Sequence, residues 1–151
     1  MPTRRETLQR SAAVAGLLAT AGFPQFAHAA FNKSAFEAKS VQDAIKAAGG
    51  ATLIESKDVI LTAPDIAENG AVVPMGVSTA LPGVKNVLLL VEKNPLALVA
   101  IFHSFDTIDN NFVTRAKMGQ TSDVYAVALM ADGKALWSKK EVKVTLGGCG
   151  G

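Results

Sequence analysis

The stretch that decides the fold is VYAVALMADGKALWSKKEVKVTL, residues 124–146. It contains short apolar runs that are separated by turn residues such as Asp132-Gly133 and by charged residues. Its last part, Val142-Lys143-Val144-Thr145-Leu146, alternates strictly between apolar and polar letters. Because successive side chains of a strand point to opposite faces, this alternation predicts a half-buried β-strand. We expect its valines and its leucine on the core face and its lysine and threonine in water.

Similar runs recur along the chain after Gly50, and they are rich in β-branched residues. Turn residues such as Asn69-Gly70 and Leu81-Pro82-Gly83 separate them. The runs are 59–61, 72–73, 87–91, 96–102, 113–118, 124–130, 135–137 and 142–146. Seven or eight strands at this spacing predict a mainly β protein, an antiparallel β-sandwich.

A helical pattern precedes the strands, over residues 31–48. Its apolar residues recur at a spacing of three to four, as expected for one face of a helix. They are Phe36, Val41, Ala44, Ile45 and Ala48. Ser40 and Asp43 resemble a capping box, and Gly49-Gly50 supplies the left-handed geometry that ends helices. The pattern predicts one short helical unit, interrupted near Lys39.

Two of the apolar runs, 87–91 and 96–102, do not alternate, which predicts that both of their faces are covered. One face packs on the helix or on a second protein chain. We favour the second chain, because a sandwich of this size has few internal surfaces left.

Residues 1–29 have the three parts of an export signal. Basic residues including Arg4 and Arg5 come first, an apolar run follows at 12–23, and Ala27 and Ala29 supply the small residues of a cleavage site. The apolar run is shorter than the roughly 20 residues that span a bilayer, so we expect no membrane span. The paired arginines resemble the twin-arginine signal, which exports folded proteins, and a general secretory signal is the alternative. We expect cleavage after Ala29 and a periplasmic protein.

The charge balance argues against nucleic acid as a partner. The chain has 15 basic and 13 acidic residues, and three of the basic residues but one of the acidic ones lie in residues 1–29. Without that segment the formal charges cancel, so no basic surface for a polyanion is expected.

The only cysteine of the chain, Cys149, lies in the sequence Gly147-Gly148-Cys149-Gly150-Gly151. In an oxidising compartment such a cysteine is free, paired with another chain or modified. Its glycine neighbours have no side chains with which to build a core, and they make the segment thin and flexible. The segment also lacks a base that would activate the thiol. We therefore expect 147–151 to be a flexible arm that presents the sulfur, about 10 Å beyond the last strand, to other proteins.

The tail, together with residues 142–146, resembles the C-terminus of the SoxY family, the sulfur-carrying subunits of the bacterial Sox thiosulfate-oxidation system. The similarity extends upstream through residues 63–70, 73–75, 92–95 and 114–118. One departure is Leu96 after Asn94-Pro95, where many relatives are expected to have a second proline.

The resemblance implies an immunoglobulin-like sandwich over residues 30–146 and covalent attachment of sulfur intermediates to Cys149. It implies a heterodimer with a SoxZ-like subunit, which is exported together with its partner. Three transient partners follow as well: a haem c thiosulfate-coupling enzyme, a manganese-containing sulfate-releasing hydrolase and a sulfane dehydrogenase. In this system the chain is a substrate carrier and not an enzyme, and it needs no cofactor or metal of its own.

An alternative remains open, namely an exported immunoglobulin-like binding module whose Cys149 cross-links a dimer. A ubiquitin-like carrier that uses Gly150-Gly151 is excluded by the export signal and by the number of strands. Among other polar residues, we interpret His103 as a strand-end residue. Asp106 and Asp109 form a solvated turn, because calcium needs more oxygen ligands than these two supply. The aromatic residues Tyr125 and Trp137 are expected to pack in the core, and a role as interface anchors is the alternative.

Overall fold

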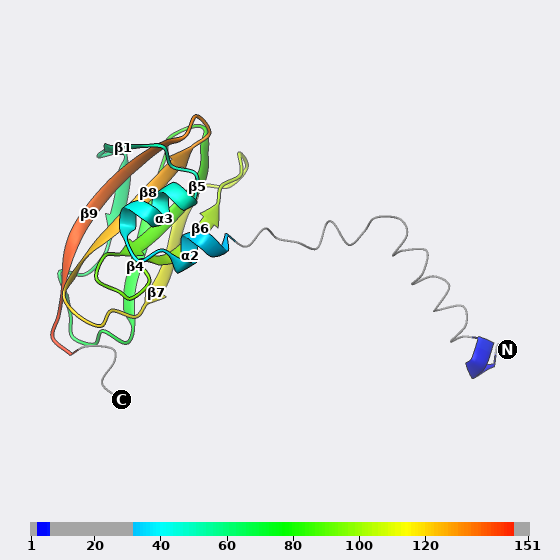
Figure 1. Cartoon of the computed structure of the whole chain (residues 1–151), viewed down its shortest axis with the longest axis horizontal. Helices are drawn as coiled ribbons and strands as arrows, with labels where there is room; N and C mark the ends of the chain where they lie inside the picture. Colours follow the sequence, from blue (N-terminus) through cyan, green and yellow to red (C-terminus); the bar gives the residue numbers. More distant parts are fainter. Residues whose placement is uncertain (1–2, 7–31, 147–151) are drawn as a thin grey trace. The chain divides into compact units, whose positions relative to one another are not determined.

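The computed structural model describes residues 3–6 and 32–146, and the chain divides into two units, 1–31 and 32–151. In the first unit, Arg4 and Arg5 are exposed. Every strand of the described residues lies in the second unit (Figure 1). No helix in the described ranges has the length and apolar character needed to cross a membrane.

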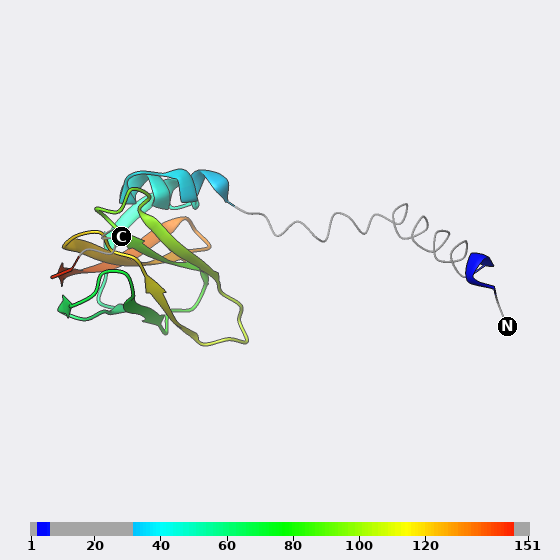
Figure 2. The same cartoon turned by 90° about the horizontal axis from the view of Figure 1, so that it is seen from below.

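The second unit is a two-sheet sandwich with two short helices. Its elements are α2 (Lys33–Glu37), α3 (Val41–Ala47), β1 (Thr52–Glu55), β2 (Val59–Thr62), β3 (Ile66–Ala67), β4 (Val73–Thr79), β5 (Val84–Val91), β6 (Leu98–His103), β7 (Asn110–Ala116), β8 (Ser122–Met130) and β9 (Lys134–Val144). The larger sheet has the order β1-β9-β8-β5-β6, with β3 beside β9, and the smaller sheet has the order β2-β4-β7. Figure 2 shows the helices over the larger sheet, on the side away from the smaller one. The predicted mainly β sandwich is confirmed.

The helical segment folds as the sequence predicts. α2 ends at Glu37 and α3 begins at Val41, so the interruption near Lys39 is confirmed. The Ser40 hydroxyl accepts a hydrogen bond from the Asp43 N–H at 3.1 Å and donates to the Asp43 carboxylate at 2.7 Å. The chain then leaves the helix through Gly49, whose φ of +107° lies in the left-handed region.

The run 87–91 is covered on both faces, but the partner chain that we favoured does not cover it. Its residues are all 0% exposed. Val87, Leu89 and Val91 face the smaller sheet in the main core. Leu88 and Leu90 belong to a second apolar cluster, to which α2 and α3 contribute. The helices of the same chain therefore bury the outer face of β5, and the preference for a partner at this run is wrong.

The run 96–102 is less covered than predicted. β6 lies at one edge of the larger sheet, and most of its residues are half-buried. Leu96, just before this strand, is 49% exposed. An edge strand has a neighbour on one side only, so its side chains lack part of the packing that a central strand receives.

β9 differs most from the sequence prediction. The run 135–137 and residues 142–144 of the next run belong to one strand of 11 residues, with polar residues in its middle. β9 also pairs in parallel with β1 and β3, two short strands that the sequence did not predict, whereas all other pairings are antiparallel. Val142 is buried as expected, but Leu146 is 69% exposed because it lies past the end of the strand and of the core.

Candidate functional site

The expected attachment residue, Cys149, and the glycines around it, Gly147, Gly148, Gly150 and Gly151, lie outside the described residues. Ala27 and Ala29 of the expected cleavage site lie outside them as well. The structure does describe the point from which the tail departs. We call residues 142–146, the end of β9 and the two residues after it, the root of the tail.

Main-chain hydrogen bonds hold the root along its whole length. The Lys143 N–H donates to the Asp65 carbonyl at 3.0 Å, and the Thr145 N–H donates to the Ala67 carbonyl at 3.1 Å. At the last described residue, the Leu146 carbonyl accepts a hydrogen bond from the Gly70 N–H at 2.8 Å. We call residues 65–70 the strap, because this segment runs along the root in parallel through β3. Successive bonds of this kind fix the direction in which the chain leaves the sandwich.

Side chains add to this anchorage. The Thr145 hydroxyl donates to the Glu68 carbonyl at 3.1 Å, and the Thr121 hydroxyl accepts from the Val144 N–H at 3.0 Å. On the other side of the strap, the Lys140 ammonium contacts the Asp65 carboxylate at 2.8 Å.

The same ammonium donates to the Ala63 carbonyl at 2.8 Å. The hydrogen bond from Lys140, and then its positive charge, hold the pKa of the Asp65 carboxyl below its ordinary value. Lys140 thus joins the beginning of the strap to β9.

The internal segments that carry the family resemblance converge on this root. Residues 63–70 form the strap and its approach, and the Met118 N–H at the end of 114–118 donates to the Gly70 carbonyl at 2.7 Å. The Asn94 amide donates to the Lys117 carbonyl at 2.7 Å, which joins 92–95 to the same cluster. The start of β4 completes it, because Val73 pairs with Ala116. The sequence showed these segments as separate motifs and gave no sign that they meet at the tail.

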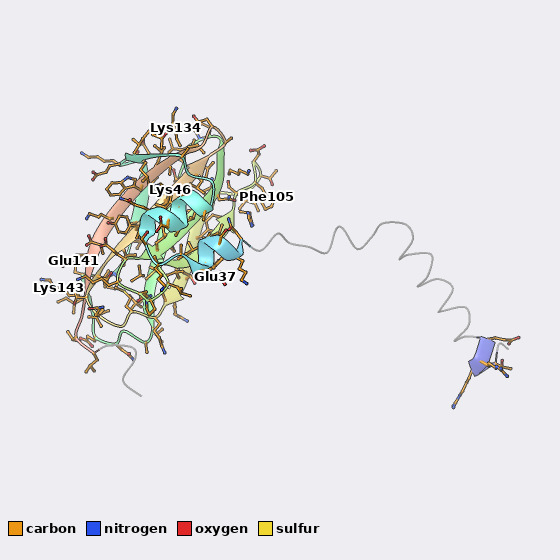
Figure 3. All side chains as sticks on the ribbon, in the orientation of Figure 1. Glu37, Lys46, Phe105, Lys134, Glu141 and Lys143 are labelled. Atoms are coloured by element: carbon orange, nitrogen blue, oxygen red, sulfur yellow. The ribbon has the colours of Figure 1, made fainter. Side chains whose placement is uncertain are left out.

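The surface around the root is mixed in character. Leu146, Ile66 and Val72 are 69%, 57% and 54% exposed. Lys143 and Glu141 project from the final part of β9 (Figure 3). Single exposed apolar residues are common on protein surfaces. Here three of them lie in segments that adjoin one another: Leu146 in the root, Ile66 in the strap and Val72 in the loop after the strap.

The root contains no base that could activate a thiol. His103, the only histidine among the described residues, ends β6 as predicted, and its ring Nδ1 is 2.8 Å from the Asn86 amide oxygen. Asn86 pairs with Leu129 near the far end of β8, whereas Val142 of the root pairs with Ser122 at the start of that strand. The histidine therefore belongs to the other end of the sandwich.

The remaining residues that the sequence singled out are two aspartates and two aromatic residues. Asp106 and Asp109 are exposed in the loop before β7, as predicted. Within the described part of the chain, no group of three or more His, Cys, Asp or Glu side chains is placed to hold a metal ion. Tyr125 and Trp137 are half-buried and pack against the second apolar cluster, which confirms the expected core packing in part. They also line a groove that the sequence did not reveal.

The sequence and structure were compared with known proteins. The profile of the family described as sulfur oxidation protein SoxY matches residues 45–149 of this chain, so the matched range extends to Cys149. No match is found among curated protein sequences.

Two solved structures resemble this chain. The sulfur carrier protein SoxY from Chlorobium limicola f thiosulfatophilum is 34% identical, with a TM-score of 0.64, and the alignment covers 71% of this chain and 97% of that one. One form of the superoxide reductase (neelaredoxin) from Ignicoccus hospitalis is 17% identical, with a TM-score of 0.50, and the alignment covers 67% of this chain and 86% of that one. The second likeness concerns the sandwich fold alone.

Proposed function

Because the chain belongs to the SoxY family of sulfur oxidation proteins, we propose that it carries sulfur intermediates covalently on Cys149 and presents them to the enzymes that process them. The observation that carries this proposal is the anchorage of the root of the tail by hydrogen bonds to the strap. Its last described residue, Leu146, is hydrogen-bonded to the strap, and Cys149 follows three residues later. A fixed root and a tail almost without side chains suit a residue that several enzymes have to reach.

The adduct chemistry proposed for Cys149 begins with thiosulfate. The thiolate and the sulfane sulfur of thiosulfate form an S–S bond, and the two electrons released pass to a haem c enzyme. Water then cleaves the terminal S–SO₃⁻ bond, so that sulfate leaves and a persulfide stays on the cysteine. A sulfane dehydrogenase accepts six electrons from the outer sulfur, which takes three oxygen atoms from water and becomes a sulfonate, and a second hydrolysis releases this group as sulfate and restores the thiol. Persulfide and disulfide chemistry both require an accessible sulfur.

In this proposal the chain itself is not an enzyme. The described residues of the root offer no histidine, so the activation of Cys149 falls to the coupling enzyme, to the manganese-containing hydrolase and to the dehydrogenase. The tail of glycines allows entry into narrow active sites, because no Cβ atoms next to the sulfur would contact their walls. The carrier needs no cofactor, and its lasting partner is a SoxZ-like subunit in a heterodimer.

We also propose the following organisation and location. Residues 1–29 are an export signal with Arg4 and Arg5 as its twin arginines and cleavage after Ala29. Residues 30–146 form the carrier domain, and residues 147–151 form the flexible arm. The twin-arginine route would carry the folded heterodimer to the periplasm.

Intact-mass spectrometry without reductant tests the carrier proposal. The protein is recovered from cells that oxidise thiosulfate, and its C-terminal peptide is fragmented. A thiosulfonate or sulfane adduct on Cys149 that reductant removes is the expected result. A bare thiol, or only a symmetric disulfide between two chains, would instead indicate the binding module cross-linked through Cys149. As a functional control, Cys149→Ser should fold normally and abolish thiosulfate-dependent turnover in a reconstituted system.

A further inference from the structure

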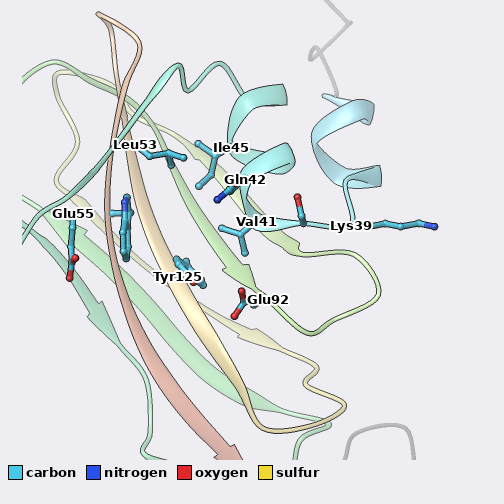
Figure 4. Close-up of a pocket in the computed structure, with 10 residues that line it drawn as sticks. Lys39, Val41, Gln42, Ile45, Leu53, Glu55, Glu92 and Tyr125 are labelled. Carbon is cyan, nitrogen blue, oxygen red and sulfur yellow. The ribbon is translucent and has the colours of Figure 1, made fainter.

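A groove opens on the outer face of the larger sheet, beside α3 and away from the root of the tail. Its volume is about 470 Å³, and residues of α3, β1, β8 and β9 line it (Figure 4). The helices cover the part of this face that holds Leu88 and Leu90. Beyond their edge, Tyr125 and Trp137 form the floor of the groove and are half-buried.

The floor is suited to a cation. The ring centroids of Tyr125 and Trp137 are 5.7 Å apart, and the rings are tilted by 46°. The face of an aromatic ring is electrostatically negative and attracts a positive charge. The Lys139 ammonium shows this attraction, because it lies 5.6 Å from the centroid of the Tyr125 ring. Its charge is already paired with Asp123 at 2.7 Å, so it does not neutralise the rest of the groove.

Two carboxylates stand at the rim. Glu55 of β1 and Glu92, just after β5, both line the groove and are exposed, and within residues 32–146 neither takes part in an ion pair. Lys39 also lines the groove, but its side chain points away from it (Figure 4). Burial, and then the negative charge of Glu92, raise the pKa of the Tyr125 phenol, so this ring stays neutral at physiological pH. The groove therefore combines aromatic faces with unpaired negative charge.

We propose that this groove binds an arginine side chain of a partner protein. The guanidinium lies over the aromatic floor, between Glu55 and Glu92, and the apolar residues next to it contact Val41 and Leu53 on the walls. Arginine suits the site better than lysine, since its planar group stacks on rings and bonds carboxylates with several N–H donors. The open shape favours a side chain presented by a protein, whose neighbouring residues exclude water, over a small free cation.

The site is separate from the tail. Trp137 precedes the end of β9 at Val144 by seven residues, which corresponds to about 23 Å along a strand. An arginine bound in the groove therefore makes no contact with the root of the tail. The inference does not depend on the carrier proposal, and the failure of either leaves the other standing.

Trp137 makes the test direct, because it is the only tryptophan of the chain. Its fluorescence is followed while the full chain is titrated with the peptide acetyl-Leu-Arg-Leu-amide at constant ionic strength. The control peptide has neutral citrulline in place of arginine. We expect a saturable change with the arginine peptide and binding weaker by about tenfold with the control, because the charge is lost. Equal responses to the two peptides, or no saturable change up to about 10 mM, would overturn the proposal.

Variants locate the binding. Glu55→Gln and Glu92→Gln keep the size of the side chain and remove its charge. Each should therefore lower the affinity for the arginine peptide about three- to tenfold. Glu141→Gln removes an exposed carboxylate of β9 that does not line the groove, and it should leave the affinity unchanged. If all three substitutions weaken binding alike, the effect reflects the general charge of the domain and the groove is not the site.

Discussion

Replacing Gly50 by alanine would test how closely α3 packs on the larger sheet. A Cβ atom at this position would lie 2.5 Å from Ile45 Cγ2 and 3.1 Å from both the Ile45 carbonyl oxygen and Ala135 Cβ. Carbon atoms in contact are normally about 3.5–4.0 Å apart, so Ile45 would have to withdraw by about 1 Å. Ile45 Cγ2 is attached directly to Cβ, and a β-branched side chain in a helix has one strongly preferred rotamer, so this methyl group cannot turn away easily. The helix itself must therefore shift.

Overpacking of this kind costs about 1–3 kcal/mol. Alanine also lowers the conformational entropy of the unfolded chain, which stabilises the folded state by about 0.4–1 kcal/mol. We expect Gly50→Ala to lower the free energy of unfolding by about 1–2 kcal/mol. The clash has a specific partner, so Ile45→Ala should relieve most of it. That substitution alone costs about 2–5 kcal/mol, and in its presence the effect of Gly50→Ala should become much smaller.

The assay is urea unfolding followed by the fluorescence of Trp137. Gly49→Ala is the matched control, because its Cβ would meet no atom within 4 Å but its φ of +107° strains any other residue. It should cost about 1 kcal/mol, and Ile45→Ala should not change that cost. If Gly50→Ala is as stable as the wild type, or if its cost is the same with and without Ile45→Ala, the packing argument is refuted.

Three further predictions concern the tail, the strap and the core. Deleting Gly147-Gly148 shortens the reach of the thiol from about 10 Å to about 3.5 Å. Iodoacetamide should still react at a similar rate, whereas a maleimide borne on a protein should react about tenfold more slowly, and equal slowing would contradict the reach argument. The Asp65 pKa is lowered by Lys140, so the ion pair stabilises the fold above about pH 4 and is lost as pH falls through the folded-state pKa. Urea unfolding should show Asp65→Asn to be destabilising at pH 7 and neutral near pH 2, and a constant difference would contradict this. Leu89→Ala, at a 0% exposed position, should cost about 2–5 kcal/mol, whereas Val113→Ala, at a 75% exposed position, should cost under about 0.5 kcal/mol in the same assay.

The sequence predicted the helices and strands that can be recognised from residues close together in the chain. Ser40 and Asp43 are close in the chain, so a capping motif is enough to place the start of α3. β8 and most other strands appear as apolar runs because the two sheets bury their side chains. The middle of β9 is polar and half-buried, so one long strand looked like two.

The parts that the sequence did not predict depend on distant contacts. All four residues of β1 are exposed, and β3 has only two residues, so neither leaves a periodic pattern. Both are strands only because they pair in parallel with β9, along the edge of β9 that does not pair with β8. The helical cover of Leu88 could not be distinguished from cover by a partner, because burial leaves the same apolar letters in either case.

In the candidate site, too, the sequence revealed what depends on neighbouring residues and missed what depends on distant contacts. Cys149 could be selected from the sequence because its glycine neighbours cannot support a structural role. The strap could not, because it holds the root chiefly through main-chain groups, which every residue except proline possesses. The exposure of Leu146 was missed for a related reason, since alternation predicts a face but not where the core ends.

On the proposal that Cys149 carries the sulfur, the strap matters because it limits the length of chain between a fixed residue and the thiol. With the root held at Leu146, Cys149 lies three residues out and reaches about 10 Å. If the chain were held only as far as Val142, the thiol would lie seven residues out and reach about 24 Å. The volume that it explores would then grow by roughly fourfold, and its concentration at a docked enzyme would fall by about the same factor. A strap that holds residues 143–146 through backbone hydrogen bonds therefore keeps the free length of chain before Cys149 short, and no side chain of residues 147–151 is needed for it.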